Sequence, residues 1–172
     1  MNNFILKHII RFVVLITIQV LVLNNVLFMG YINPYIYILF LLLLPFDTPR
    51  WLILILAFCL GISVDASQNT MGLHVFSCVL IAYCRRPILH FLLPQLKNKK
   101  QIYLEFSLQE FGLQRALIYT GSLVFIHHFS LFILEVFQLE LLSVFLRTLG
   151  SSIVSITLLI IIQYLLFKDA KR

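Results

Sequence analysis

The residues that could do chemistry stand near the ends of apolar runs. Asp65 closes one run, His74 opens the next, and His128 and Glu135 lie seven positions apart in a third. Seven positions are nearly two turns of a helix, so His128 and Glu135 would share one face about 10 Å apart along the axis. We therefore expect them to be neighbours without direct contact.

The spacing of the candidate residues argues against two kinds of catalytic site. Asp65, His74, His127 and His128 offer zinc ligands, but no HExxH or similar spacing joins them. Residues 150–152 read Gly-Ser-Ser, which lacks the GxSG pattern of an intramembrane serine protease. We predict no catalytic residue, no metal and no cofactor.

The polar residues have two other interpretations. Ionisable groups at membrane depth are costly and tend to pair, and Arg147 has Asp65, Glu135 and Glu140 as candidate counter-ions. These residues with His74 and His128 form either a polar layer that holds helix ends in register or an outward-facing groove for a partner or ligand. The sequence leaves both open.

These residues are carried by a chain with the composition of a membrane protein. Of 172 residues, 61% are hydrophobic and 12% charged, whereas soluble domains are about half apolar and a quarter charged. We predict a single all-α domain of six transmembrane helices. They lie near residues 9–29, 34–46, 51–65, 71–92, 115–136 and 143–167.

The second and third of these runs are short. A helix needs about 20 residues to cross the hydrocarbon, and the two runs are separated by residues 45–50, which hold two prolines and two charges. We expect two short helices joined by a tight turn. The first run resembles a secretion signal but lacks small residues at a cleavage site, so we expect a retained helix.

Basic residues predict the orientation. Cytoplasmic segments of membrane proteins carry excess Lys and Arg. With six spans and a cytoplasmic N-terminus, Arg147 alone lies outside, and both termini are cytoplasmic. The cations on the inside are Lys7, Arg11, Arg50, Arg85, Arg86, Lys97, Lys99, Lys100, Arg115, Lys168, Lys171 and Arg172. Their places at span ends favour anionic lipid head groups over nucleic acid as the binding partner of this basic chain, whose net charge is +6.

Small residues predict where helices pack closely. Ser151 and Ser155 are four apart, a spacing that lets backbones approach, and Gly121 is expected to do the same in the preceding span. Gly72 is a further packing candidate. The connection 87–114, whose residues Ile102, Leu104, Phe106 and Leu108 alternate with others, is expected to pack on the membrane surface or to dock a cytoplasmic partner.

Two groups of polar side chains in the first spans have structural interpretations. Gln19 can hydrogen-bond to a neighbouring helix. Tyr31, Tyr35 and Tyr37 are typical of an aromatic belt at the membrane interface.

Several short motifs, in their order, resemble the Bacteroidetes-type form of the rod shape-determining protein MreD family. They cover most of the chain. They are Pro34–Leu39, Leu44–Phe46, Gly61 with Asp65, Gly72–His74, Ala82–Pro87, His127–His128, Leu131–Phe132 and Glu135–Phe137.

The resemblance implies a non-enzymatic inner-membrane component of the cell-elongation (rod) complex. It implies MreC as principal partner, in an assembly with MreB, RodA and its transpeptidase. The implied fold is similar to the substrate-binding subunits of energy-coupling-factor transporters. A small-molecule-binding subunit of such a transporter, with a cavity lined by Asp65, His74, His128 and Glu135, is the alternative.

Overall fold

The computed structural model describes residues 2–25, 32–93, 105–106, 111–136 and 141–168, and the regular elements in these ranges are helices. The expected all-α class is confirmed. The elements are α1 (Asn2–Leu21), the 3-10 turn η1 (Leu23–Asn25), α2 (Ile38–Leu42), α3 (Arg50–Gln68), α4 (Leu73–Leu92), α6 (Leu113–Glu135) and α7 (Leu141–Lys168).

Five helices are long and apolar enough to cross a membrane. They cover Ile5–Asn25, Arg50–Gln68, Leu73–Leu92, Leu113–Glu135 and Leu141–Leu165. Large apolar side chains on their outer faces are exposed, for example Ile9, Leu146 and Ile153. A water-soluble protein rarely exposes so much contiguous apolar surface. The chain is therefore an integral membrane bundle of several passes.

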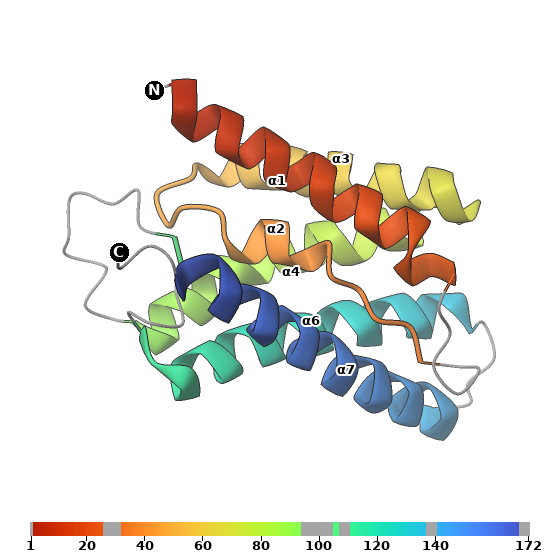
Figure 1. Ribbon diagram of the computed structural model, residues 1–172. Coiled ribbons are helices and arrows are strands. Elements are labelled where there is room, and N and C mark those ends of the chain that lie inside the picture. The colour runs from red at the N-terminus through yellow and green to blue at the C-terminus, as the bar shows by residue number, and fades with distance from the viewer. Residues whose placement is uncertain (1, 26–31, 94–104, 107–110, 137–140, 169–172) are drawn as a thin grey trace.

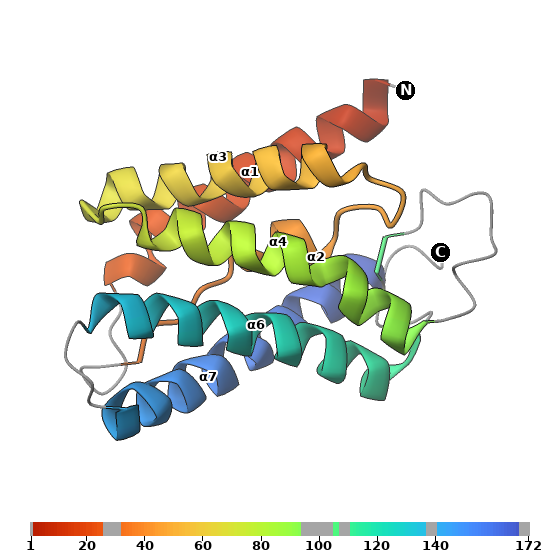
Figure 2. The same ribbon diagram turned by 180° about the vertical axis from the view of Figure 1, so that it is seen from behind.

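The long helices pack in chain order. α3 packs against α4, α4 against α6, and α6 against α7, while α1 lies on the α3 side of the bundle (Figure 1; Figure 2). Helices α1, α3 and α6 begin at the end of the bundle where α4 and α7 finish. We call this the basic end, since Lys7, Arg11, Arg50, Arg86 and Arg115 lie in the helical turns nearest to it.

The prediction of a helix over residues 34–46 is wrong. Only Ile38–Leu42 is helical, and residues 33–37 before it form no helix. This segment nevertheless runs through the centre of the bundle toward the basic end (Figure 1). No residue from Tyr35 to Leu44 is more than 4% exposed. We call residues 32–45 the buried crossing.

Surrounding helices satisfy the N–H groups of the buried crossing. Gln19 on α1 accepts from the Ile36 N–H at 2.9 Å and donates to the Pro34 carbonyl at 3.1 Å. The hydroxyls of Ser151 and Ser155 accept from the N–H groups of Asn33 and Tyr35. Non-helical backbone is tolerated at membrane depth only where protein shields and satisfies it. That condition explains why the non-helical part of the buried crossing lies inside the bundle.

The carbonyl groups of the last residue of α2 and of the residues after it accept hydrogen bonds from side chains of α1, α4 and α6. Tyr119 donates to the Leu42 carbonyl at 3.2 Å, and Arg11 reaches the Leu43 carbonyl at 3.5 Å. Arg85 donates to the Leu44 carbonyl. The Thr48 hydroxyl then closes the expected tight turn on the Pro45 carbonyl at 2.8 Å.

Other helix bounds also differ from expectation. The third helix is not short, because α3 has 19 residues and ends where Asn69 adopts a left-handed conformation, φ 55°. α1 begins at Asn2 rather than near residue 9 and ends at Leu21 rather than near 29. Its early start is possible because Lys7 and Arg11, inside the helix, both bind a carboxylate.

Candidate functional site

Asp65 serves the start of α4. Its Oδ1 accepts the His74 N–H at 3.1 Å, its Oδ2 accepts the Val75 N–H at 2.9 Å, and the Thr70 hydroxyl also donates to it. The first N–H groups of a helix have no partner within the helix, and its N-terminus attracts negative charge. The expectation that Asp65 could balance Arg147 is therefore wrong.

Near the start of α4, Tyr37 joins two histidines from different helices. Its hydroxyl lies 2.7 Å from His74 Nδ1 on α4 and 2.8 Å from His127 Nε2 on α6. His74 Nε2 lies 2.9 Å from Gln68 Oε1. The ring of Tyr35 packs edge-on against both histidines. Tyr35 and Tyr37 are thus interior residues and not an interfacial belt; Tyr31 lies outside the described residues.

One tautomer assignment satisfies this chain. An N–H at His74 Nε2 donates to the Gln68 oxygen, which leaves Nδ1 to accept the Tyr37 hydroxyl proton. The Tyr37 oxygen then accepts from an N–H at His127 Nε2. Among the described residues, His127 Nδ1 remains a buried acceptor without a hydrogen bond. This series of hydrogen bonds contains only neutral donors and acceptors, which an apolar interior favours.

His128 forms a second, adjoining chain. Its Nδ1 donates to the Val124 carbonyl at 2.9 Å, so Nε2 can accept the Ser155 hydroxyl at 3.2 Å. The same Ser155 oxygen accepts the Tyr35 N–H at 3.0 Å. His128 is therefore tied to the buried crossing through α7.

The pair Glu135 and Arg147 lies at the edge of this region. Their side chains approach to 2.9 Å, and the Arg147 guanidinium lies 4.2 Å above the Phe132 ring. Phe132 in turn packs against the His128 ring at 5.7 Å between centroids. Of the candidate counter-ions for Arg147, Glu135 is the one found, and Glu140 lies outside the described residues.

The predicted site residues therefore fall into two sets. Asp65, His74 and His128 are 6%, 1% and 0% exposed and are hydrogen-bonded to the protein's own groups, whereas Glu135 and Arg147 form a more exposed ion pair. The first set holds the ends of α3, α4 and α6 around the buried crossing. Within the described residues, no three His, Cys, Asp or Glu side chains are placed to hold a metal ion.

The packing candidates are placed differently from expectation. Gly72 has φ 84°, and a Cβ added to it would meet no atom of the described residues within 4 Å, so it provides a turn before α4 rather than a helix contact. A methyl group on Gly121 would meet only Ile156, at an ordinary 3.7 Å. The close approach is at Gly61, where a Cβ would lie 2.4 Å from the Val75 Cα. Sequence spacing did not indicate this close approach, because the helix that packs against a glycine is known only from the fold.

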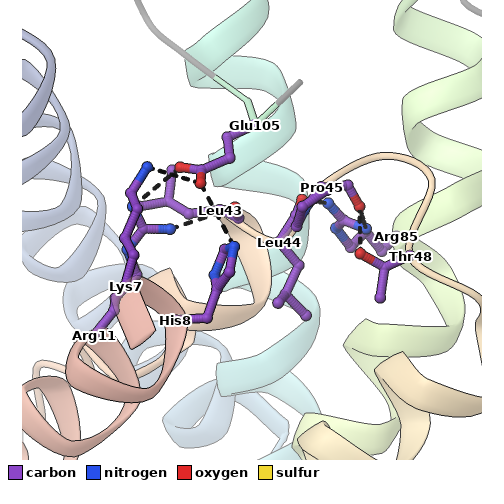
Figure 3. A network of polar contacts seen from close by, with 9 residues as sticks. All are labelled: Lys7, His8, Arg11, Leu43, Leu44, Pro45, Thr48, Arg85 and Glu105. Carbon is purple, nitrogen blue, oxygen red and sulfur yellow. Dashed lines mark hydrogen bonds and ion pairs between the residues drawn. The ribbon is translucent and has the colours of Figure 1, made fainter. Parts of the chain in front are cut away.

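At the basic end, three side chains of α1 face Glu105 (Figure 3). Lys7 and Arg11 bind its carboxylate at 2.9 and 3.0 Å, and His8 Nε2 lies 3.6 Å away. Burial by itself would raise the pKa of Glu105, but the hydrogen bonds and charges of Lys7 and Arg11 outweigh it and hold the pKa below its ordinary value.

Next to Glu105, Phe106 points into the bundle. It is fully buried and packs against Phe111 and Tyr119, with centroids 5.2 and 4.3 Å apart. At this point the connection 87–114 is tied to the bundle rather than free to dock a partner. Ile102, Leu104 and Leu108 lie outside the described residues.

Arg85 is a buried side chain that holds the end of the buried crossing, whereas the sequence indicated only its contribution to membrane orientation. It is 1% exposed, and its guanidinium binds the Tyr119 hydroxyl at 3.0 Å. It also binds the carbonyls of Leu44 and Pro45 (Figure 3). Its position seven residues after Cys78, on the buried face of α4, could have revealed this.

A lateral groove completes the candidate site. It encloses about 480 Å³ between α1, α3 and the buried crossing, and the side chains around it are mainly apolar. Because Ile5, Ile9 and Cys59 on its rim are exposed, it opens on the surface that faces lipid. We call it the lateral groove; it is lined by Ile5, His8, Ile9, Phe12, Phe40, Leu44, Pro45, Thr48, Leu52, Leu56 and Cys59.

Comparison with known proteins adds no relative: no protein family, curated protein or solved structure matches this chain.

Proposed function

We propose that this chain is a non-enzymatic scaffold of the bacterial cell-elongation complex. In this role it lies in the inner membrane with both termini cytoplasmic, and it binds the transmembrane helix of MreC. Through that partner it supports cell shape and peptidoglycan synthesis, together with MreB, RodA and the RodA transpeptidase. The motif resemblance motivates the choice of partner, and the lateral groove is the observation that carries the binding mode.

The groove suits an apolar helix better than a soluble ligand. Helix association within lipid depends on close packing of side chains, because lipid tails are as apolar as the helices. Phe12, Phe40 and Leu56 line the groove, and it opens where a single-span partner would approach. A soluble molecule would instead need polar groups that fix its orientation.

The transporter alternative has less support. It requires an outward cavity lined by Asp65, His74, His128 and Glu135. The first three are buried and engaged in hydrogen bonds within the protein. Opening such a cavity would exchange several of these hydrogen bonds for hydrogen bonds to water, at a net cost of about 0.5–1.5 kcal/mol each.

Two neighbouring isoleucines of α1 provide a matched test. Ile9 lines the lateral groove and is 54% exposed, whereas Ile10 is 53% exposed and does not line it. Ile9→Trp should fill the groove and lower the recovery of MreC in affinity purification from mild detergent, and Ile10→Trp should leave recovery unchanged. Equal recovery from both variants would refute the binding mode.

The native thiol of Cys59 allows a direct measurement. It lies in the groove and is exposed, while Cys78 is buried. Single cysteines placed along the MreC transmembrane helix should form disulfides with Cys59 on oxidation, with a helical period, and Cys59→Ser should abolish them. If no single-span protein co-purifies and a vitamin-like ligand does, the scaffold proposal is wrong.

A further inference from the structure

A second cavity lies at the basic end, between α3 and α4. It has a volume of about 170 Å³ and joins two arginines to apolar and aromatic side chains. Its lining residues are Arg50, Ile53, Leu54, Ala82, Tyr83, Arg86 and Pro87. It shares no lining residue with the lateral groove, and it is separate from the hydrogen bonds around Tyr37.

The register of α3 and α4 brings the two arginines to the same level. The helices are antiparallel and cross closely where Gly61 meets Val75. Arg50 lies eleven residues from Gly61 toward the basic end, and Arg86 lies eleven residues from Val75 in the same direction. Both residues therefore reach one cavity, although they are far apart in the sequence.

The positive charges of Arg50 and Arg86 line one cavity. Within the described ranges neither guanidinium forms an ion pair, and the carboxylates that do form ion pairs are Glu105 and Glu135. Arg86 donates to the Thr48 carbonyl at 2.9 Å, which fixes one side of its guanidinium. The nearby Asp47 is exposed and is not within ion-pair distance of either arginine. Two like charges held together favour an anionic ligand.

The surroundings indicate that this anion belongs to a lipid. Next to Arg50, Trp51 is 63% exposed, and across the cavity Tyr83 is 72% exposed. Trp and Tyr prefer the level of the lipid head groups. Toward the bundle centre, Ile53 and Leu54 offer an apolar path for an acyl chain.

We propose that Arg50 and Arg86 bind the phosphate of an anionic phospholipid. The planar guanidinium matches phosphate oxygens in a bidentate geometry. Basic pockets between transmembrane helices are suited to such head groups. Lipid in this position would bridge α3 and α4 beside the turn that follows the buried crossing, so its binding stabilises the folded bundle by mass action.

The test compares arginines at the same end of the bundle. The full-length protein is purified in detergent, and the phosphatidylglycerol and phosphatidylcholine that it retains are counted by native mass spectrometry. Wild type should retain phosphatidylglycerol preferentially. Each of Arg50→Gln and Arg86→Gln should weaken this binding about fivefold, from about 1 kcal/mol per cation. Arg115→Gln, which removes an exposed charge outside the cavity, should have no effect.

Three results would overturn the proposal. They are equal retention of the two lipids, the same loss in Arg115→Gln as in Arg50→Gln, and displacement of phosphatidylglycerol by millimolar inorganic phosphate. Arg50 is exposed and donates no hydrogen bond to the described protein groups, so Arg50→Gln is expected to fold. Arg86→Lys keeps the charge and should retain more lipid than Arg86→Gln.

Discussion

Replacing Gly61 by alanine tests how closely α3 and α4 pack. The added Cβ would lie 2.4 Å from the Val75 Cα and 2.7 Å from its nitrogen. Both atoms belong to the backbone, so no side-chain rotation relieves the contact. Ordinary contact begins at 3.4 Å. The two helices must therefore separate by about 1 Å at the crossing, a gap that forfeits a quarter to a half of the affected dispersion energy.

We expect Gly61→Ala to lower the free energy of unfolding by about 1–3 kcal/mol, the usual cost of overpacking. Gly121→Ala is the matched control, since it lies in α6 with its nearest neighbour, Ile156, at 3.7 Å. Replacing a helix glycine by alanine without strain raises stability by about 0.4–1 kcal/mol. The two identical substitutions should therefore have opposite signs.

The assay is unfolding in mixed micelles by titration with a denaturing detergent, followed by far-ultraviolet circular dichroism. A Gly61→Ala protein as stable as wild type would refute the close crossing. Destabilisation by both substitutions alike would show that α6 and α7 also approach closely, as the sequence predicted.

Three further substitutions test the buried polar groups by the same unfolding assay. Because the folded-state pKa of Glu105 is lowered, its stabilising effect is complete above the unfolded-state pKa and is lost as pH falls through the folded-state value. Wild type should lose stability in acid relative to pH 7, whereas Glu105→Gln, less stable by about 1–2 kcal/mol at pH 7, should lose less on acidification. Tyr37→Phe removes the hydroxyl between two buried histidines and should cost about 1–3 kcal/mol, while Tyr83→Phe on the exposed surface should be neutral. Ser155→Ala leaves a buried backbone N–H unpaired and should cost about 1–3 kcal/mol; no loss would contradict its bond to the buried crossing.

Several features of the candidate site could be predicted from local sequence. Asp65 and His74 are close in the chain, and they meet across the α3–α4 turn as their spacing suggests. Glu135 and Arg147 flank one connection and pair across it. Their partners lie within about a dozen residues, so few arrangements of the chain keep them apart. His127 and His128 were identified as polar residues of interest, but not their bonds to Tyr37 and Ser155.

The partners that the sequence did not indicate are distant in the chain. Arg85 binds the Leu44 carbonyl, 41 positions away, and Ser155 binds the Tyr35 N–H, 120 positions away. A non-helical stretch inside a membrane cannot be predicted from its local sequence, because its backbone groups would be unpaired without the rest of the fold. Only a fold that supplies those partners from four other helices makes it stable.

The sequence by itself determined that this chain lies in lipid, that its main elements are helices and that its cations gather at span ends. Hydropathy and charge are properties of single residues that add along the chain, so they can be counted without knowing the fold. The tertiary structure decided that one crossing is broken, that Tyr35 and Tyr37 lie inside, and that Gly61 is the close contact. These depend on which groups face one another across helices, and hydrogen bonds and steric contacts exist only between such pairs.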